Sequence, residues 1–457
     1  MVFNSLEYII FLLICVLTLR NITNIKIFQI ALTLFSWFFY SFLNIKLLLL
    51  IFIFSLSCWI LSNLIYTKPE IKKIVLTSGI FLILAQLAIF KYLGWFTQIA
   101  LEFYDLNSTF KIILPIGISF YSFQAISYLV DLSKNKKVYI SGFWHLSAYL
   151  AFFPQLIAGP IERSIALAPQ LLKPKFASHR MISTGLLLII AGLCKKILLA
   201  DNLGAVVQYT DSNLIQPGFG LLLLIAFSFQ IYFDFSAYTD IARGSARILG
   251  IKLRVNFIQP YISRSPQEFW KRWHISLSEW IKDYVYIPLR KQGFQYITAI
   301  IIAFGLSGLW HGAGFGFIAW GFWNALILLI YARLPKSFLQ NSQYHTFQIF
   351  LLFILILIGW SFFYSDSTLK FLQIYHSILR PIIYLQLPSL EFYTIMIFIT
   401  ALISPVMYFE VITRGRRSLS DFISLRMNLS GTFILVTYIL IQSFYKRTGN
   451  EFIYFQF

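Results

Sequence analysis

Long apolar segments recur along the whole chain, and they limit what it can fold into more than any other feature. Early examples cover residues 6–19, 27–42 and 47–66. Helices of about 17–25 apolar residues cross the roughly 30 Å hydrocarbon core of a bilayer. Of the 457 residues, 58% are hydrophobic and only 12% are charged, which is too little charge for an ordinary soluble domain. The pattern predicts an all-α polytopic membrane protein with about 10–12 spans, some of them re-entrant.

The basic residues are spread between the apolar runs rather than clustered as in a nucleic-acid-binding surface. The chain has 37 Lys and Arg against 18 Asp and Glu, a net charge of +19. With the N-terminus outside, about 28 of these basic residues fall in cytoplasmic loops, as the positive-inside rule requires. These loops are residues 20–26, 67–73, 131–137, 159–180, 243–291, 333–345 and 412–428. The charge pattern predicts a multi-pass protein with both termini outside.

Cysteine and histidine usage gives no sign of a metal site or a disulfide framework. Cys15, Cys58 and Cys194 lie in apolar segments and form no C-x-x-C pair. The six histidines show no His-x-x-x-His spacing. The first apolar run lacks a basic n-region and a small-residue cleavage site, so we interpret it as a retained helix. We therefore expect no bound metal or cofactor.

We interpret the chain as one membrane domain with three parts. Residues 1–110 form N-terminal spans, residues 111–335 a core with re-entrant segments, and residues 336–457 C-terminal spans. Residues 148–163 contain Pro154, Gly159 and Pro160 between two basic connections, which favours a re-entrant segment over a simple span. Residues 113–131 carry many small and hydroxylated side chains, as close helix packing or a polar cavity lining requires.

A few charged residues lie within or beside apolar runs. Lys195 and Lys196 suggest side chains that reach an interface or line an aqueous cavity. Asp240 can pair with Arg243 or Arg247 on one helical face. Asp234 lies deeper, among aromatic residues, and is a candidate substrate contact, although a local structural role is also open.

Residues 263–291 begin with a helix-start signal and continue as an amphipathic pattern. Ser265, Pro266 and Glu268 fit an N-cap, a first helical position and a capping box. The apolar residues then recur at spacings of three and four, which predicts one helix lying at the cytoplasmic interface. That stripe consists of Trp270, Trp273, Leu277, Trp280, Ile281 and Tyr284, with His274 at its edge.

The most unusual polar residue is His311, which lies inside a long uncharged run. Residues 292–332 contain no Lys, Arg, Asp or Glu, and as one helix they would measure about 60 Å, twice the bilayer core. The run must therefore turn back, and the glycines around His311 predict the break there and allow a substrate to approach the backbone. A buried His can be a satisfied structural residue, but it can also serve as a general base for an alcohol near neutral pH.

Several motifs together resemble the membrane-bound O-acyltransferase (MBOAT) family, in its bacterial branch of alginate and peptidoglycan O-acetyltransferases and teichoic acid D-alanyl transfer proteins. The matching segments cover residues 1 to about 330 and end with two highly specific ones. They are "FNSLEYIIFL", "LPIGISFYSFQAISYLVD", "PQLIAGPIER", "FDFSAYTDIARG", "FWKRWHISLSEWIKDYVYIPL" and "GLWHGAGFGFIAWG". The family's usual glycine-containing turn after "YIPL" is replaced here by "PLRKQG".

The resemblance implies a ring of helices around a central funnel and acyl transfer across the membrane, in the cytoplasmic (inner) membrane of a bacterium. The donor would be a cytoplasmic thioester, acetyl-CoA or an acyl-carrier protein, and a secreted SGNH-type acyltransferase or esterase would be a partner. His311 corresponds to the family's invariant His, and His274 to its second motif His. Further candidate contacts to substrate or donor are Trp310, Asp234, Lys271, Arg272, Trp273 and Asn324. Lys271 and Arg272 would hold donor phosphates or contact lipid headgroups.

The favoured function is transfer of an acetyl group to a hydroxyl of an envelope polysaccharide. D-alanyl transfer to teichoic acid is an alternative within the same family. Broken helices and buried polar residues also describe a transporter or flippase of envelope precursors. A non-catalytic scaffold for a secreted glycan-modifying enzyme is a third class.

Overall fold

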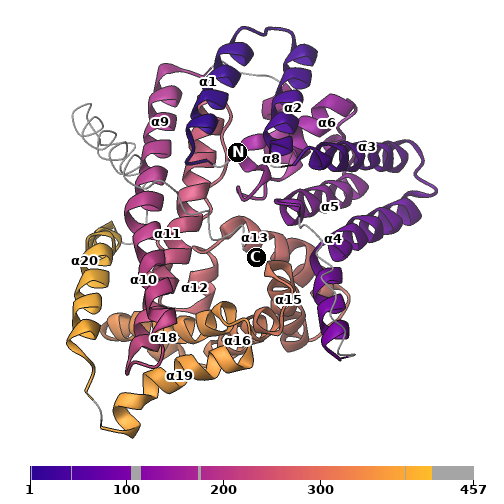
Figure 1. The fold of residues 1–457 in the computed structure, drawn as a ribbon. Coiled ribbons are helices and arrows are strands. Elements are labelled where there is room, and N and C mark those ends of the chain that lie inside the picture. Colours follow the sequence, from indigo (N-terminus) through magenta and orange to yellow (C-terminus); the bar gives the residue numbers. More distant parts are fainter. Residues whose placement is uncertain (2, 43, 104–114, 173–176, 386, 414–457) are drawn as a thin grey trace. The chain divides into compact units, whose positions relative to one another are not determined.

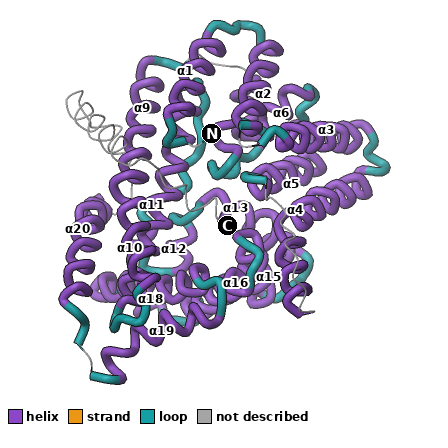
Figure 2. Tube along the Cα trace, in the orientation of Figure 1, coloured by secondary structure: helices purple, strands orange, loops and turns teal. Residues whose placement is uncertain are grey.

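The protein is built of helices throughout the part that the structure describes. The computed structural model describes residues 1–457 except 2, 43, 104–114, 173–176, 386 and 414–457, and no strand occurs in the described part (Figures 1 and 2). Six of these helices are long and apolar enough to cross a membrane: Lys46–Thr67, Lys72–Thr97, His179–Ser212, Phe219–Ile248, Ser342–Tyr364 and Leu390–Phe409. Three shorter apolar helices are Ile25–Ser41, Tyr296–His311 and Phe315–Tyr331. The chain is an all-α, multi-pass membrane protein, as its apolar runs predict.

The described residues form two compact units, each with its own set of helices. The first unit contains Met1–Ile190 and Tyr238–Val255, and the second contains Ala191–Ala237 and Asn256–Phe457. Two helices, α9 (His179–Cys194) and α11 (Phe219–Ile248), run from one unit into the other. The expected single domain with three parts is neither supported nor contradicted by this division. The predicted connection at residues 412–428 falls almost entirely outside the described residues.

The first unit contains the N-terminal helices and the interrupted segment. Its other elements are α1 (Leu6–Arg20), α2 (Ile25–Ser41), α3 (Lys46–Thr67), α4 (Lys72–Phe103), α5 (Ile118–Lys134), η1 (Lys136–Val138), α6 (Phe143–Leu150), α7 (Phe153–Leu156) and α8 (Ser164–Leu172). The predicted spans at 6–19, 27–42 and 47–66 coincide with α1, α2 and α3. Residues 148–163 are a buried chain of short helices and turns, so they do not form a continuous span.

Packing in the first unit depends on close backbone contacts and buried polar pairs. Gly117 has a φ of 81°, and a Cβ there would lie 2.5 Å from the carbonyl oxygen of Leu156, so only glycine fits. The Tyr8 hydroxyl donates to Ser245 Oγ at 2.7 Å. The predicted pair of Asp240 and Arg243 is present, at 3.0 Å and buried. Both pairs satisfy polar groups that are buried in an apolar interior, where a missing partner would be costly.

The second unit contains the segments that the sequence singles out for chemistry. Besides parts of α9 and α11 it holds η2 (Lys195–Ala200), α10 (Asp201–Ser212), η3 (Pro260–Ile262), α12 (Pro266–Trp270), α13 (Ile275–Ile281), η4 (Lys282–Tyr286), α14 (Ile287–Lys291), α15 (Tyr296–His311), α16 (Phe315–Tyr331), α17 (Lys336–Gln340), η5 (Ser342–Tyr344), α18 (His345–Tyr364), α19 (Thr368–Ile383) and α20 (Leu390–Thr413). Of these, η2 and η4 are π-helical turns, which are frequent at functional sites. In this unit α16 packs between α15 and α18.

Candidate active site

His311 ends one apolar helix, and a short glycine turn begins the next. Helix α15 runs from Tyr296 to His311, and α16 starts at Phe315 after residues 312–314. The predicted reversal of the uncharged run is therefore confirmed, at the predicted residue. The position at a helix end matters because the imidazole is held by two helices and not by a flexible loop.

The glycines near His311 serve mainly to bring α15 and α16 together. A Cβ on Gly308 would lie 2.2 Å from the carbonyl oxygen of Phe317, and one on Gly321 would lie 2.4 Å from that of Phe304. A Cβ on Gly316 would lie 2.4 Å from the carbonyl oxygen of Phe362 in α18. The prediction that the glycines around His311 let a substrate approach the backbone is wrong for Gly308 and Gly316, because protein backbone already occupies the space.

The His311 side chain is buried and surrounded by aromatic rings from three helices. It is 7% exposed. Its ring centroid lies 4.9 Å from that of Trp310, 4.9 Å from that of Trp320 and 5.3 Å from that of Phe363, all edge to face. Trp310 belongs to α15, Trp320 to α16 and Phe363 to α18. Such rings fix the orientation of the imidazole and keep bulk water away from most of it.

The predicted interfacial helix is broken in the middle, at His274. Helix α12 ends at Trp270 and α13 begins at Ile275, while His274 has a left-handed φ of 42°. The prediction of one continuous helix over residues 266–284 is therefore wrong. The amphipathic spacing did not reveal that Asn256 takes over the hydrogen bonds at the break. The backbone N–H of Ile275 donates to the Asn256 carbonyl at 3.0 Å, and the Ser276 N–H donates to Asn256 Oδ1 at 3.0 Å.

This break places the His274 ring in an apolar environment next to Trp310. His274 is 1% exposed. Its ring centroid lies 4.8 Å from that of Phe235 and 5.6 Å from that of Trp310, both edge to face. Burial lowers the pKa of His274 to about 3. The imidazole is therefore neutral near pH 7, and Trp310 contacts both His274 and His311.

The residues expected to hold donor phosphates differ strongly in their environments. Lys271 is exposed at the end of α12, whereas Arg272 donates to Glu268 Oε1 at 2.8 Å. Although burial raises the pKa of Glu268, the hydrogen bond from the Arg264 backbone and the charges of Arg272 and Arg264 lower it below its ordinary value. Glu268 also receives the Arg264 N–H at 2.9 Å, while Ser265 Oγ caps the Glu268 N–H at 3.2 Å as predicted.

Trp273 and Asn324 both lie in packed interior positions. Trp273 is 2% exposed, and its ring stacks on Phe269 at 5.6 Å and lies 5.1 Å from Trp360. Asn324 is 5% exposed, and its Nδ2 donates to the Trp320 carbonyl at 2.8 Å. The structure thus places Trp273 in an aromatic core and Asn324 one helical turn from a ring that contacts His311.

Asp234 forms a buried ion pair with Lys196. Lys196 Nζ lies 2.7 Å from Asp234 Oδ1 and 3.1 Å from Asp201 Oδ1, with all three side chains at most 3% exposed. Lys196 therefore does not extend to an interface, in contrast to the expected behaviour of near-membrane lysines. The Lys196 ammonium is shared by two carboxylates, and this pairing lowers the cost of burying the three charged groups. Asp234 adjoins Phe235, the residue that contacts His274.

Three residues of this site were missed by the sequence reasoning. Phe363 lies in a segment that reads as a plain span, Trp320 is one aromatic residue among many, and Asn256 precedes the motif that it supports. Their contacts join positions 9 to 52 residues apart. The spacing of residues within one helix cannot predict contacts between different helices. The residues next to Phe363 and Asn256 form no motif that would indicate these contacts.

Comparison with known proteins gives a family match that includes the residues of this site. The profile of the MBOAT, membrane-bound O-acyltransferase family, matches residues 30–365, a range that includes both histidines. The chain is 33% identical over 385 residues to the probable alginate O-acetylase AlgI of Pseudomonas putida, covering 80% of this chain and 78% of the relative. It is 32% identical over 389 residues to the peptidoglycan O-acetyltransferase of Helicobacter pylori, covering 76% and 73%. It is 28% identical over 248 residues to the teichoic acid D-alanyltransferase of Bacillus subtilis, covering 50% and 61%.

The match extends over most of the chain and through the segments that carry His274 and His311. A multi-pass helical membrane protein with these motifs, at this level of identity to such relatives, is an O-acyltransferase. The chain belongs to the membrane-bound O-acyltransferase family.

Proposed function

We propose that this protein transfers an acetyl group from a cytoplasmic thioester to a hydroxyl group outside the membrane, for modification of an envelope polysaccharide. The observation that carries the proposal is His311, a buried imidazole held at a helix end by three aromatic rings within a family of O-acyltransferases. Two relatives that match 80% and 76% of this chain are named for O-acetylation of alginate and of peptidoglycan. The setting would be the inner membrane of a bacterium, with the N-terminus outside.

His311 would act as the general base. Its imidazole accepts the proton of the acceptor hydroxyl as the oxygen attacks the thioester carbonyl. The carbon–sulfur bond then breaks, and the imidazolium returns the proton to the thiolate. The protein supplies a fixed base in a dry site, which brings the two substrates together and prevents loss of the acyl group to water.

His274 would act as a positioning residue rather than as a second base. A group with a pKa of about 3 is a poor proton acceptor at neutral pH. Its ring, however, packs against Trp310, which in turn packs against His311. Asn256 fixes the backbone just after His274, so a chain of defined contacts leads from the broken helix to the base.

The donor would approach from the cytoplasmic side, near α12 and α13. Acetyl-CoA and acyl-carrier proteins both present phosphate groups. Lys271 is exposed there, while Arg272 is already engaged with Glu268, so Lys271 is the better candidate for a phosphate contact. The acceptor side would involve a secreted SGNH-type partner that completes the transfer to the glycan.

Acetyl transfer is favoured over D-alanyl transfer by the extent of the match. The acetylating relatives of P. putida and H. pylori cover about three quarters or more of this chain, whereas the D-alanyl transferase of B. subtilis covers half. Transport of a precursor gains no support from Asp234, because this carboxylate is neutralised by Lys196 in the structure. A coupling site would need a carboxylate that exchanges its partner with a transported ion.

The ester content of the cell envelope tests this proposal. A strain carrying His311→Ala at normal protein level should lose alkali-labile acetate from its envelope, because the acceptor hydroxyl is no longer deprotonated. His345→Ala is a matched control, since His345 lies at the exposed start of α18 next to Arg264. The control strain should keep its acetate. Retained acetate in the His311→Ala strain would refute the proposed function, and release of D-alanine instead of acetate would show the alternative acyl group.

A further inference from the structure

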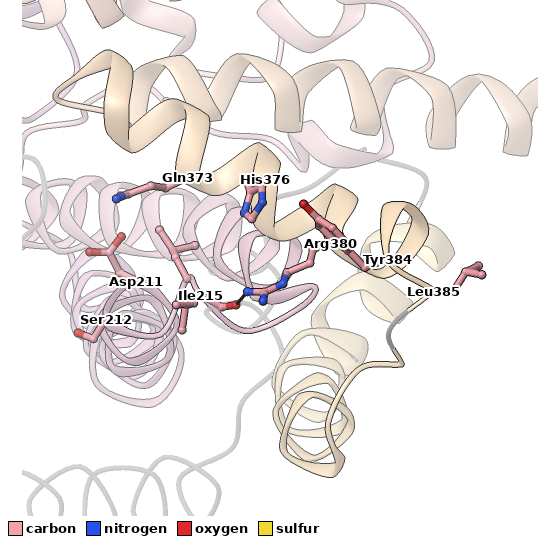
Figure 3. A pocket seen from close by; sticks show the side chains of 9 residues that line it. Asp211, Ser212, Ile215, Gln373, His376, Arg380, Tyr384 and Leu385 are labelled. Carbon is pink, nitrogen blue, oxygen red and sulfur yellow. Dashed lines mark hydrogen bonds between the residues drawn. The ribbon is translucent and has the colours of Figure 1, made fainter.

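A second site lies in the second unit, in a pocket of about 940 Å³ between the end of α10 and helix α19. Figure 3 shows side chains from both elements around it. Its polar lining consists of Asp211, Ser212, Gln373, His376 and Arg380, and its other lining residues are Leu214, Ile215, Tyr384 and Leu385. None of these residues belongs to the candidate active site around His274 and His311. The pocket lining thus contains both polar and apolar side chains.

The pocket has a rigid wall, because α19 is firmly attached to the start of α11. Ser377 Oγ donates to the Gln216 carbonyl at 2.7 Å and accepts from the Gly220 N–H at 3.0 Å. The Gly218 N–H donates to the Ser377 carbonyl at 2.8 Å. Ile374 is fully buried in a cluster with Leu214, Leu223, Leu224 and Leu357. The side chains that line the pocket are therefore presented from a fixed helix.

The charge inside the pocket favours an anion. Asp211 forms an ion pair with Lys370, so its negative charge is compensated. Arg380 donates one hydrogen bond to the Ile215 carbonyl, and a guanidinium has five N–H donors in all. The His376 ring lies one helical turn before Arg380, beside the Tyr384 ring with centroids 6.5 Å apart. An arginine with unused N–H donors beside an imidazole is suited to a phosphate group (Figure 3).

The outer surface of α19 is apolar, which points to an amphiphilic ligand. Besides its buried face, the helix carries a row of exposed apolar side chains: Leu369 at 66%, Leu372 at 58%, Leu379 at 44%, Ile382 at 73% and Ile383 at 59%. The helix lies between two candidate spans, Ser342–Tyr364 and Leu390–Phe409. The loop at residues 213–218 likewise connects two candidate spans. An exposed apolar helix that connects two candidate spans is typical of the membrane interface.

We propose that this pocket binds an anionic glycerophospholipid. The phosphate would contact Arg380 and His376, while the acyl chains would run over Ile215, Leu385 and the exposed apolar row of α19. In the chain, one candidate span separates the pocket residues 211–215 from the strongly basic residues 249–291, so the positive-inside rule assigns the lipid to the outer leaflet. An acidic glycan carries a similar anion, but it has no acyl chains to pack against Ile215, Leu385 and the exposed apolar row of α19.

Lipid binding to the purified full-length protein tests the proposal. The protein is exchanged into nanodiscs of phosphatidylcholine with a small share of phosphatidylglycerol, and retained lipid is measured by native mass spectrometry. Arg380→Gln should lower retention of phosphatidylglycerol about tenfold, as the loss of one charge-assisted contact implies. Arg290→Gln is the matched control, because Arg290 also donates to a backbone carbonyl, that of Phe294, at 2.6 Å but lies outside the pocket. Arg290→Gln should leave retention unchanged.

Further arms distinguish the sources of the anion. Ile382→Asn changes an exposed side chain that folding does not need, and it should also reduce retention, because the acyl chains lose apolar contact. Free glycerol 3-phosphate should not displace the lipid. The proposal is overturned if phosphatidylcholine and phosphatidylglycerol are retained equally, if Arg380→Gln retains as much as Arg290→Gln, or if glycerol 3-phosphate or an oligouronate displaces the lipid. All these experiments measure lipid binding alone, so their outcome does not depend on whether the protein transfers an acyl group.

Discussion

Single residues explain why two histidines in similar motifs differ in role. His311 stands at the end of a helix, with aromatic edges around it, in the part of the motif where α15 turns into α16. His274 adopts a left-handed backbone and is almost fully buried. Under the proposed function, the first arrangement would present a base, and the second would hold the Trp310 ring in position. The two roles lead to different responses to pH and to substitution.

Stability should fall as the solution becomes acidic, through His274. Its folded-state pKa of about 3 lies below the ordinary value near 6.5, so between these values the unfolded chain binds a proton that the folded chain does not. The contribution of His274 to the free energy of unfolding is therefore fully present above about pH 6.5. It declines below that pH, by about 2 kcal/mol at pH 5. Thermal unfolding in detergent across this range measures the decline.

The same unfolding series on His274→Asn supplies the comparison. Asparagine tolerates the left-handed backbone and does not titrate, so the variant should lose most of the decline between about pH 7 and about pH 5. An acid decline equally steep in wild type and variant would show that other groups cause it.

At the scale of elements, the sequence predicted helices well where one helix follows one pattern. Helices at 6–19, 27–42 and 47–66, the start at Ser265 and the reversal at His311 are all present, and the helix at 47–66 is long enough to span a membrane. The continuous helix at 266–284 is absent, because Asn256 supplies hydrogen bonds from outside the segment. The aromatic surroundings of His311 were not predictable either, because Phe363 reaches the imidazole only through the packing of α18.

Removal of the Asn256 side chain should weaken the start of α13. Its Oδ1 accepts from the Ser276 N–H at 3.0 Å and from Ser276 Oγ at 2.9 Å, both buried. Asn256→Ala leaves both donors without this acceptor, which should cost about 2–3 kcal/mol and lower the thermal unfolding midpoint. Acyl transfer should fall as well, because the neighbouring His274 loses its fixed position.

The companion variant Ser276→Ala separates the two hydrogen bonds. It removes only the hydroxyl and leaves the backbone donor paired, so its cost should be clearly smaller than that of Asn256→Ala. Equal unfolding midpoints for Asn256→Ala and wild type would contradict the role assigned to Asn256.

At the scale of the whole molecule, the orientation of the loops decides how the two substrates reach the site. The basic connection at residues 249–291 and the sparsely charged one at residues 365–389 should lie on opposite faces of the membrane. This orientation would give the proposed donor access from the cytoplasm near α12, and it would place the proposed lipid pocket outside. The family assignment alone does not supply the orientation.

Cysteine labelling in spheroplasts checks the orientation. In a Cys194→Ser background the remaining cysteines, Cys15 and Cys58, are buried. Leu387→Cys, at a position 85% exposed, should react with a membrane-impermeant maleimide in intact spheroplasts. Lys291→Cys should react only after permeabilisation. The reverse labelling pattern would require the opposite orientation.

The central claim, that His311 is the base for O-acyl transfer, is tested most directly with purified protein in vesicles. Labelled acetyl thioester is supplied on one side and an acceptor with a free hydroxyl on the other, and the initial rate of ester formation is measured. Loss of a general base should lower the rate of a His311→Gln variant about 10²–10⁴-fold, while the folded protein remains present in equal amount. A His311→Gln rate within a few-fold of wild type would contradict the account.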